Sequence, residues 1–596
     1  MVLARGSATY PTLRPAAGAC EQDTSDWQRA VERAAAQLGE VVPAWRWRAI
    51  GLSGMIPTLV TLGPAGQPTG PAIIWQDSRA DDLGDEFRER HGSADLYRLT
   101  GQWVDGRYLL PMFGRIARAD PDRAAATATI ASAKDYLFAW LTGELATDPS
   151  TACGYGCYEL ETGRWNAAAL TAAGLADTAT SAPGTAPGTR AAGSRRGPGL
   201  PALWPPTASR PLRPEAAARL GCAPLPVVLG AADSVLGALG LGVREPGQVA
   251  YIAGTSTVIL GITGRLVLDP SHRFLVTPLA EPGRWGIEMD LLATGSAITW
   301  LAGLLGDNLT AAGLVQLAAP ADPAQAPVLL PYLSPGEQGA LWDPLLRGAV
   351  VGLDLSHGRE HLARALVNGI VLESRRCLAV LDETCGSGRA VQVAGGSATD
   401  RSFRADLANA TRRQVSMPRD DGAGPSARGA ALIAALAVEG DWPDGACPAA
   451  DVTAEPDHTR AKVWDELWDA HESARQRLHP RLGASRSGRL PGHRCLTPSR
   501  AALRFRRTPK VAWHPFPPGI SKAPIETTYD GRPFAGTDLH RRPVSAGADD
   551  RTWPAAPDSH EQQQPAGAAR RSPGRQVARI VLAPLHADRQ ASYADR

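Results

Sequence analysis

One segment, VVLGAADSVLGALGLG at residues 227–242, constrains the fold of this chain more than any other. Apolar residues form a strand-like run that ends in small residues, presents one acid, Asp233, and continues as a helix of small residues. A strand that turns directly into a helix is typical of α/β folds. The segment therefore predicts an α/β protein that carries a carboxylate at a strand end.

The same alternation of strand-like and helix-like segments extends over most of the chain. Short β-rich runs occupy residues 48–54 and 57–63, and helical spacing marks residues 26–41, where Asp26 stands at the N-cap position. Strands and helices continue to alternate after the middle of the chain, ending with a helix-like segment at residues 424–440. The pattern favours the α/β fold class throughout.

The length of 596 residues exceeds what one hydrophobic core supports, so two or more domains are expected. Charge is distributed unevenly between two parts of the chain. Residues 484–596 carry 19 Lys+Arg and 9 Asp+Glu, a net charge of +10, whereas residues 1–483 have a net charge of −8. The acidic part is typical of a soluble protein body, and the basic part is a separate segment.

Two segments are expected to lie outside the packed cores. Residues 178–209 are rich in Pro, Gly, Ala and Ser and predict a mobile loop. Residues 484–596 are rich in Arg, Pro, Ser and Gln without sustained periodicity, so they bury too little apolar surface to offset their conformational entropy. We expect this tail to be disordered. Its charge alone would favour nucleic acid, but it lacks patterned aromatic residues, and no nucleic-acid partner is expected.

Targeting, membrane and cysteine-based functions are not indicated. The N-terminal MVLARGSATY has no apolar signal-peptide core, and the longest apolar stretch, residues 225–243, is interrupted by Asp233 and four glycines. The eight cysteines include no CxxC pair. We therefore expect a cytoplasmic protein with no membrane partner and no cysteine-based metal site.

Asp233 has two interpretations that the sequence leaves open. A lone carboxylate among apolar neighbours at a strand end is where a general base is often held, because desolvation without a nearby cation raises its pKa. The alternative is that Asp233 caps the helix that follows it.

Two glycine-containing turns offer sites for phosphate or nucleotide. YIAGTSTVILGI, residues 251–262, is a hairpin between β-branched runs, and its tip presents backbone N–H groups and hydroxyls that suit a phosphate chain. VQVAGGSATD, residues 391–400, is a strand-to-helix turn in which Gly395 and Gly396 let a ligand approach the backbone. The sequence contains no P-loop GxxxxGK[ST] and no GxGxxG after a strand, so it predicts neither a P-loop nor a dinucleotide fold.

Taken in order, these segments resemble the FGGY family of carbohydrate kinases, and xylulokinases most closely. The resemblance covers residues 2–482 except 178–209. It rests on GLSGMIPTLVTL, PAIIWQDSRA, SAKDYLFAWLTGELATDPSTACG, LGAADSVLGALGLG, GTSTV, LLPYLSPGEQGALWDPLLRGAVVGL, HLARALVNGIVLES and VAGGSATDRSFRADLAN.

The resemblance implies two actin/hexokinase-like (ribonuclease H-like) domains around a cleft. Residues 1–240 would form an N-terminal sugar-binding domain, and residues 241–483 a C-terminal nucleotide-binding domain. The implied activity is that of an ATP-dependent carbohydrate kinase, xylulokinase-like, which phosphorylates a sugar or polyol with ATP and Mg²⁺. A homodimer is left open.

The resemblance also implies roles for single residues. Asp233 matches the catalytic base, which takes the proton of the sugar hydroxyl as that oxygen attacks the γ-phosphate. The implied sugar-binding residues are Met55, Ile56, Pro57, Asp77 and Asp233, and the implied ATP-binding residues are Gly254, Thr255, Ser256, Gly295, Gly396, Ser397 and Asp400. No metal-ligating residue is assigned.

Two departures from the family pattern bear on function. Xylulokinases usually carry Gln-Met-His at the sugar turn, where this chain has Met55, Ile56 and Pro57. Losing the imidazole removes a hydrogen-bond partner for a sugar hydroxyl, so the sugar is not specified. The family also opens with a β-hairpin bearing an Asp-x-Gly-Thr motif, whereas Met1 stands where the third strand is expected. Because phosphoryl transfer depends on positioning and charge neutralisation, the alternative is a catalytically impaired kinase that only binds sugar or nucleotide.

Overall fold

The computed structural model divides into two compact units, Met1–Ser485 with Ser572–Arg596, and Arg486–Arg571. The second unit lies outside the residues that the structure describes. The fold and sites below belong to the first unit. The described residues are 2–172, 198–306, 308–334, 339–343, 346–386, 388, 390–419, 424–443, 448, 450–478 and 575–582.

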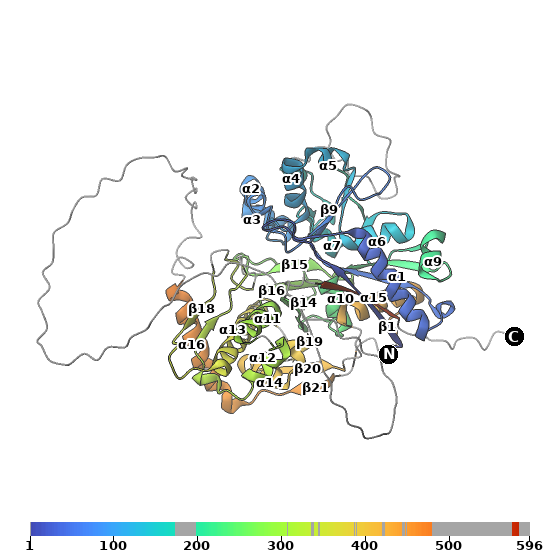
Figure 1. Ribbon diagram of the computed structural model, residues 1–596. Helices are drawn as coiled ribbons and strands as arrows, with labels where there is room; N and C mark the ends of the chain where they lie inside the picture. Colours follow the sequence, from blue (N-terminus) through green and yellow to red (C-terminus); the bar gives the residue numbers. More distant parts are fainter. Residues whose placement is uncertain are drawn as a thin grey trace, which may run out of the picture. The chain divides into compact units, whose positions relative to one another are not determined.

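Strands and helices alternate through the first half of the chain (Figure 1). Its strands are β1 (Ala4–Pro11), β2 (Glu21–Gln22), β3 (Ile50–Gly54), β4 (Thr58–Leu62), β5 (Ala72–Ile74), β6 (Thr129–Ala131), β7 (Ala146–Thr147), β8 (Tyr158–Glu159), β9 (Arg164–Trp165), β10 (Ala202–Leu203), β11 (Ser209–Pro211) and β12 (Pro226–Ala232). Its helices are α1 (Thr24–Val41), α2 (Asp81–His91), α3 (Ser93–Thr100), α4 (Leu109–Ala119), α5 (Pro121–Ala126), α6 (Ala133–Thr142), α7 (Pro149–Cys153), α8 (Ala167–Ala172), α9 (Pro214–Leu220) and α10 (Asp233–Gly240).

Two small sheets form the frame of this half. One is antiparallel, in the order β2-β5-β4-β6, and the other has the order β11-β12-β3. In the second sheet β12 runs parallel to β3, and Ala232 is paired with Gly54 at the ends of the two strands. Because the carboxyl ends of these strands meet at one edge, the turn after β3 and Asp233 after β12 are neighbours.

Helix α1 begins earlier than the spacing of its apolar residues indicates. The N-cap is Asp23, whose carboxylate accepts a hydrogen bond of 2.8 Å from the backbone N–H of Ser25. Asp26 lies in the first helical turn and pairs with Arg29. The expectation of Asp26 as the cap was therefore wrong. Both acids precede the apolar residues of the helix, so the sequence does not distinguish them. Asp23 is the cap because its backbone is extended, as an N-cap residue requires.

Part of the segment expected to be a mobile insert is ordered. β10 pairs in parallel with β7, and the indole N–H of Trp165 donates to the carbonyl of Pro201 at 3.0 Å. The expectation was therefore wrong for residues 198–209, which backbone pairing and a tryptophan hydrogen bond fix in place. Residues 178–197 of the insert lie outside the described residues.

The second half of the chain adds a larger sheet and longer helices. Its strands are β13 (Val249–Ala253), β14 (Thr257–Thr263), β15 (Leu275–Pro278), β16 (Trp285–Leu291), β17 (Val328–Leu330), β18 (Ala349–Val351), β19 (Ala390–Gly395), β20 (Gln414–Pro418), β21 (Ala450–Ala454) and β22 (Arg575–Leu582). Its helices are α11 (Gly295–Leu305), α12 (Ala311–Ala318), α13 (Arg359–Cys385), α14 (Arg401–Thr411), α15 (Pro425–Glu439) and α16 (Ala461–Leu478). Among the described residues no helix combines the length and apolar character that crossing a membrane needs.

A seven-stranded sheet in the order β15-β16-β14-β13-β19-β20-β21 organises this half. β13, β14, β16 and β15 are joined antiparallel, whereas β19 pairs in parallel with both β13 and β20. Helix α13 contacts β14 and β16 as well as helices α11, α12 and α14 (Figure 1). Because β13 and β19 run parallel, with Ala253 opposite Gly395, the turns after these two strands lie at the same edge.

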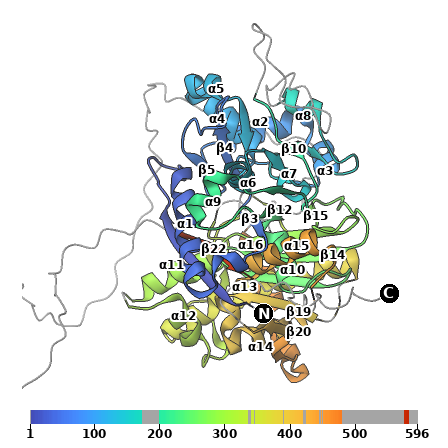
Figure 2. The same ribbon diagram turned by 90° about the vertical axis from the view of Figure 1, so that its right-hand side faces the viewer.

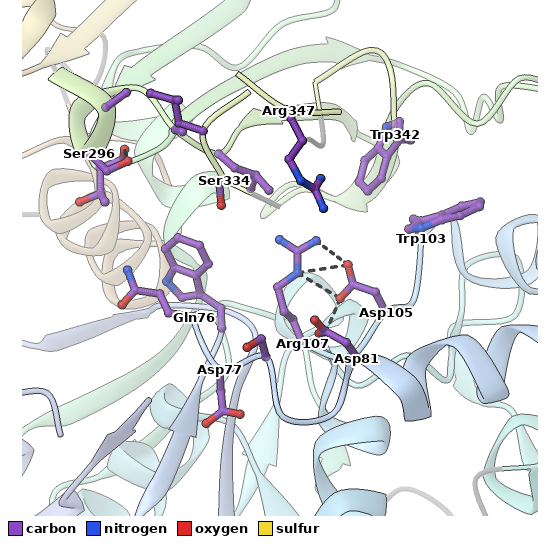
Figure 3. A pocket seen from close by; sticks show the side chains of 18 of the residues that line it. Gln76, Asp77, Asp81, Trp103, Asp105, Arg107, Ser296, Ser334, Trp342 and Arg347 are labelled. Carbon is purple, nitrogen blue, oxygen red and sulfur yellow. Dashed lines mark hydrogen bonds and ion pairs between the residues drawn. The ribbon is translucent and has the colours of Figure 1, made fainter. Parts of the chain in front are cut away.

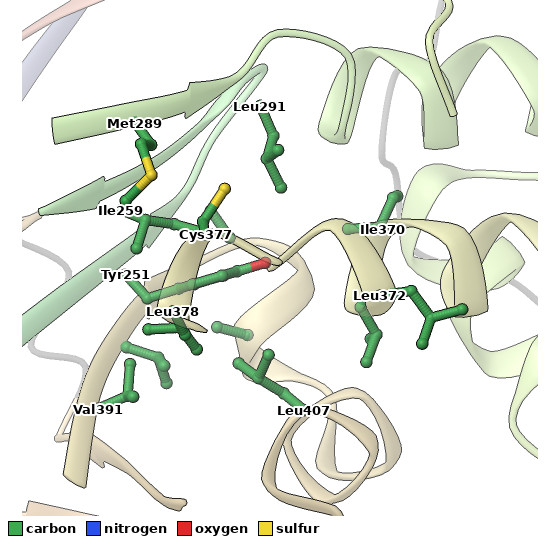
Figure 4. Packing of buried hydrophobic residues seen from close by; sticks show 14 of the residues in the cluster. Tyr251, Ile259, Met289, Leu291, Ile370, Leu372, Cys377, Leu378, Val391 and Leu407 are labelled. Carbon is green, nitrogen blue, oxygen red and sulfur yellow. The ribbon is translucent and has the colours of Figure 1, made fainter. Parts of the chain in front are cut away.

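The main hydrophobic core lies between this sheet and α13. Tyr251 of β13 is fully buried there, among side chains that include Leu378 and Val391 (Figure 4). Its hydroxyl forms a hydrogen bond of 3.1 Å with Ser374 of α13. This bond satisfies the one polar group that the aromatic ring brings into the core. The rigid sheet that results carries the 251–262 hairpin.

Helix α15 lies between strands β20 and β21 of the large sheet in the sequence but packs on the first half of the chain. It contacts β3, β12 and α10. Glycines allow this close approach, because a β-carbon on Gly240 would lie 1.9 Å from the carbonyl oxygen of Pro425, and one on Gly51 would lie 2.0 Å from that of Ala430. The two halves therefore share a core at the crossing of α10 and α15, which includes Leu236 and Ile433.

The edge of β1 is covered by a strand from the far end of the sequence. All eight residues of β1 are paired antiparallel with β22, from Ala4 opposite Leu582 to Pro11 opposite Arg575. β22 also contacts α1 and α15 (Figure 2). Residues 575–582 are thus a strand within the tail that was expected to be disordered. The remaining tail residues lie outside the described residues.

Candidate active site

The predicted base, sugar turn and phosphate hairpin line one inner cavity of about 270 Å³. The residues that line it are Met55, Ile56, Pro57, Trp75, Gln76, Gln102, Arg107, Tyr108, Gly154, Asp233, Ser234, Thr255, Ser256, Val258, Leu275, Thr277, Glu288, Asp290 and Leu292. They come from both halves of the chain, which meet at this cavity. Such a small, mixed polar and apolar cavity suits a ligand of monosaccharide size.

The turn that follows β3 forms one wall of the inner cavity. It passes through Met55 and a cis peptide bond between Ile56 and Pro57 before β4 begins. The Met55 carbonyl accepts a hydrogen bond of 3.1 Å from the hydroxyl of Thr58, and the indole N–H of Trp75 lies 3.0 Å from the Met55 sulfur. These contacts hold an apolar surface against the cavity.

Asp233 is the first residue of α10 and lies directly after the buried strand β12. One of its carboxylate oxygens accepts a hydrogen bond of 3.0 Å from the backbone N–H of Ser234. The N-cap of α10 is Ala232 rather than Asp233, so the capping interpretation is not what the structure shows. Burial raises the pKa of Asp233 to about 6, although the N–H of Ser234 acts in the opposite direction.

Two further carboxylates, on β16, line the same cavity and were missed at the level of sequence. Glu288 accepts a hydrogen bond of 3.2 Å from the hydroxyl of Ser234. Burial raises the pKa of Glu288 well above its usual range, and the neighbouring charge of Asp290 adds to this. Burial also raises the pKa of Asp290 to about 7, although Arg107 lowers it. The strand motif WGIEMDL gave one signal, since an acid at every second position of a strand puts both acids on one face.

A larger outer cavity of about 940 Å³ adjoins the inner one, and Trp75, Gln76, Arg107, Thr255 and Leu292 line both. Figure 3 shows two facing walls, with Arg347 and Ser296 on one and Arg107 and Asp105 on the other. Arg107 pairs with Asp105 through hydrogen bonds of 3.1 Å to both carboxylate oxygens.

The tip of the predicted phosphate hairpin lies between β13 and β14, which pair from Val249 opposite Gly261 to Ala253 opposite Thr257. The N–H of Gly254 donates to the carbonyl of Ser256 at 2.8 Å, which closes a tight turn. The N–H of Ser296 donates to the carbonyl of Thr255 at 3.0 Å, so the hairpin tip is joined to the start of α11. Gly295 thus stands next to the hairpin, and its role in ATP binding stays a prediction.

The glycine turn after β19 also abuts the hairpin. The N–H of Gly396 donates to the carbonyl of Ala253 at 3.0 Å. Gly395 has φ +102°, and a β-carbon there would lie 2.0 Å from the Ala253 oxygen, so the fold itself requires this glycine. A β-carbon on Gly396 meets nothing within 4 Å, and Gly396 lines a third cavity of about 280 Å³.

Two predicted site residues have side chains that the fold already uses. The Asp400 carboxylate is the N-cap of α14 and accepts hydrogen bonds from the N–H groups of Ser402 and Phe403 at 2.8 and 3.1 Å. Asp77 is 3% exposed and pairs with Arg79, although it also lines the outer cavity. Ser397 begins the short helical turn that precedes Asp400. Their roles in binding remain predictions.

No group of three or more His, Cys, Asp or Glu side chains among the described residues is arranged to hold a metal ion. Mg²⁺ does not need such a group, because it is commonly bound by one or two carboxylates and the phosphates of a nucleotide. One oxygen of Asp290 is buried without a hydrogen-bond partner in the described part of the chain. That oxygen at the inner cavity is the donor type that Mg²⁺ prefers.

The buried Asp233 carboxylate and the hairpin tip between β13 and β14 line one cavity where the two halves of the chain meet. This arrangement is typical of a phosphotransferase that acts on small molecules. The matches to family models agree with it. Residues 1–240 match the N-terminal domain of the FGGY family of carbohydrate kinases, and residues 249–438 match its C-terminal domain. The chain belongs to the FGGY family of carbohydrate kinases, as the motifs indicated.

Characterised relatives fall into more than one substrate class. The chain is 28% identical to a xylulose kinase from Escherichia coli (strain K12) over 422 residues, which cover 70% of this chain and 82% of the relative. It is 25% identical to a gluconokinase from Bacillus subtilis (strain 168) over 431 residues, which cover 70% of this chain and 80% of the relative. Both names are those of sugar kinases, which confirms the expected enzyme class.

Solved structures give the same result for the fold. The crystal structure of a xylulose kinase from Rhodospirillum rubrum aligns with a TM-score of 0.69 at 28% identity, covering 79% of this chain and 93% of that one. The expected fold, an α/β protein built from two FGGY domains, is therefore confirmed.

Proposed function

We propose that this chain transfers the γ-phosphoryl group of ATP to a hydroxyl of an uncharged sugar or polyol. The observation that carries the proposal is the inner cavity, which Asp233, Thr255 and Ser256 line together with the turn after β3. A base, a phosphate-binding tip and a wall for the acceptor thus surround one volume. Holding the acceptor and the phosphate in line is most of what catalysis of phosphoryl transfer requires.

Asp233 is proposed as the general base. Its pKa of about 6 leaves the carboxylate largely ionised at neutral pH yet basic enough to accept a proton. The acceptor hydroxyl gives its proton to Asp233 as its oxygen bonds to the γ-phosphorus. The bond from that phosphorus to the bridging oxygen breaks, and ADP leaves with the electron pair.

Nucleotide binding is assigned to the second half of the chain. The tip formed by Gly254, Thr255 and Ser256 would receive the phosphates, and the open space beside Gly396 would receive the adenosine. Asp290 would hold Mg²⁺ together with the phosphates, and the ion would neutralise phosphate charge when bound. We also propose the domain boundary near residue 240, with the sugar contacts mostly before it and the nucleotide contacts after it.

The charges of the inner cavity favour an uncharged acceptor. Asp233, Glu288 and Asp290 line it, and Arg107 is the one cationic side chain among the lining residues that the structure describes. The guanidinium of Arg107 is already paired with Asp105. A sugar carboxylate would therefore enter a site whose cation is neutralised, next to acidic groups, and such an unpaired charge is costly to desolvate. Hydroxyl groups can instead donate to the ionised Asp233 carboxylate and accept from a protonated carboxyl group, which the raised pKa of Glu288 favours.

The experiment is a coupled assay of ADP release with Mg·ATP over xylulose, ribulose, xylitol and gluconate. We expect turnover with a ketopentose or polyol at least 10-fold above that with gluconate, and loss of turnover in Asp233→Asn. Silence over a broad panel of sugars would contradict the kinase assignment and support a chain that only binds. If turnover is greatest with gluconate, the proposal of an uncharged acceptor is wrong, whereas the kinase assignment stands.

A further inference from the structure

Lys134 is a charged side chain buried at the end of β3, where a β-carbon on Gly54 would lie 2.7 Å from the β-carbon of Lys134, and the mechanism above does not use it. It lies in the first turn of α6 and is 1% exposed. Its ammonium group lies 3.0 Å from a carboxylate oxygen of Asp135 and 3.1 Å from one of Asp148. Burial lowers the pKa of Lys134, but the two carboxylates outweigh burial and the net shift is upward. The group is therefore a fixed cation.

Asp148 links this cation to helix α7. It is the N-cap of α7, and its second carboxylate oxygen accepts hydrogen bonds from the backbone N–H and the hydroxyl of Ser150. Both residues are at most 1% exposed. The Ser150 hydroxyl donates its proton to Asp148, so its lone pairs are free to accept a hydrogen bond from another group.

That hydroxyl oxygen accepts a hydrogen bond from the end of β12. The backbone N–H of Ala232 donates to it at 3.0 Å, and Ala232 immediately precedes Asp233. On the other side, the carbonyl of Asp233 accepts a hydrogen bond of 2.8 Å from the hydroxyl of Ser426 in α15. The backbone that carries the base is therefore fixed on both sides by serine hydroxyls.

We propose that Ser150, held by the Asp148 carboxylate that Lys134 anchors, is a positioning residue for Asp233. Ser150 does not line the inner cavity, so it acts on the reaction through the backbone of Ala232. Without its oxygen the N–H of Ala232 loses its buried acceptor, and the turn that aims the Asp233 carboxylate relaxes. A shift of about 1 Å in a reacting group lowers catalysis about 100-fold. The inference rests on the proposed role of Asp233 as the base.

The test compares Ser150→Ala, which removes the acceptor, with Ser150→Thr, which keeps a hydroxyl. Thr151→Val on the same helix is the matched control, because the Thr151 hydroxyl is buried without a hydrogen-bond partner in the described residues. We expect kcat to fall about 10- to 100-fold in Ser150→Ala, with the sugar KM within about 3-fold of wild type. Ser150→Thr should recover most of kcat, and Thr151→Val should match wild type.

A structural role alone would give a different pattern. If Ser150→Ala lowers kcat no more than Thr151→Val does, the proposal is wrong. The same holds if the loss of kcat follows the melting temperature across all three variants. Calorimetric titration with sugar, in the absence of ATP, separates an intact sugar site from an unfolded one. If wild type itself shows no turnover with any sugar, the kinase assignment fails first, and hydrogen exchange at Ala232 in Ser150→Ala still tests the backbone contact.

Discussion

A β-carbon on Gly295 would come within 2.2 Å of the backbone carbonyl oxygen of Gly254. The first turn of α11 and the tip of the phosphate hairpin therefore touch backbone to backbone. The hydrogen bond from the N–H of Ser296 to the carbonyl of Thr255 joins the same two elements. The N-terminal end of α11 is thus brought to the hairpin tip, and the N-terminal end of a helix favours anions such as phosphate.

Gly295→Ala should displace the hairpin tip, because the added methyl group meets backbone rather than a flexible side chain. We expect the KM for ATP to rise at least 10-fold in steady-state kinetics, while sugar binding measured without nucleotide stays unchanged. Gly303→Ala, in the same helix, is the control, because a β-carbon there meets nothing within 4 Å. Equal effects of the two substitutions would contradict the contact.

The glycine pair after β19 should separate folding from nucleotide binding. Gly395→Ala puts a β-carbon against the Ala253 carbonyl at a positive φ, so the free energy of unfolding should fall by about 2 kcal/mol or more. Gly396→Val places its side chain in open space. The second variant should melt like wild type and bind an ATP analogue more weakly in calorimetry. Unchanged affinity would move the adenosine site elsewhere.

The activity should depend on pH through Asp233. With a pKa of about 6, the carboxylate is protonated below that pH and can no longer act as a base. We expect kcat/KM to rise about tenfold per pH unit below pH 6 and then to level off. The nearby Asp290 has a pKa of about 7, so the variant Asp290→Asn is needed to tell which of the two carboxyl groups causes the rise of kcat/KM with pH. If the fall of kcat/KM below about pH 6 persists in Asp290→Asn at saturating MgCl₂, it supports Asp233 as the group that must be ionised. If that fall disappears in Asp290→Asn, it contradicts this assignment.

The same pKa makes Asp233 costly for the fold. A carboxyl group whose pKa is raised from 3.8 to about 6 binds its proton more tightly when folded, so it lowers stability as pH rises through that range. Asp233→Asn should therefore increase the free energy of unfolding at pH 8, by on the order of 1–3 kcal/mol. The gain should shrink as the pH falls and vanish only below the unfolded pKa of 3.8, at about pH 3, as measured by urea denaturation. An equal gain at both pH values would contradict the raised pKa.

Removal of β22 should expose the edge of β1. Deleting residues 572–596 leaves the backbone groups that now pair with β22 open to solvent or to another chain. We expect a lower melting temperature and more light scattering on heating than for wild type. Deleting residues 583–596 keeps β22 and is the control. Equal melting of the two truncated proteins would show that β22 adds nothing to the fold.

Sequence reasoning identified what lies in local motifs. The strand-to-helix turn at Asp233 and the hairpin tip at Thr255 are continuous segments, so their spacing alone predicts their shape. Glu288 and Arg107 were missed because only the packing of separate elements brings them to the inner cavity. Sequence reasoning treated Gly395 and Gly396 alike as glycines that admit a ligand. Only the structure shows that the backbone requires Gly395, because the φ angle and the distance to Ala253 cannot be read from a GG pair.

The packing of α15 on β3 and β12 has a consequence for how the polypeptide can be divided. A fragment ending at residue 240, where the match to the N-terminal family model ends, would lack the helix that covers Leu236 and the backbone of Gly51. Its sheet would present an apolar face to water. If the two halves were expressed as separate polypeptides, they would need to be co-expressed. They would then assemble as a heterodimer whose interface is the core now formed by α10 and α15.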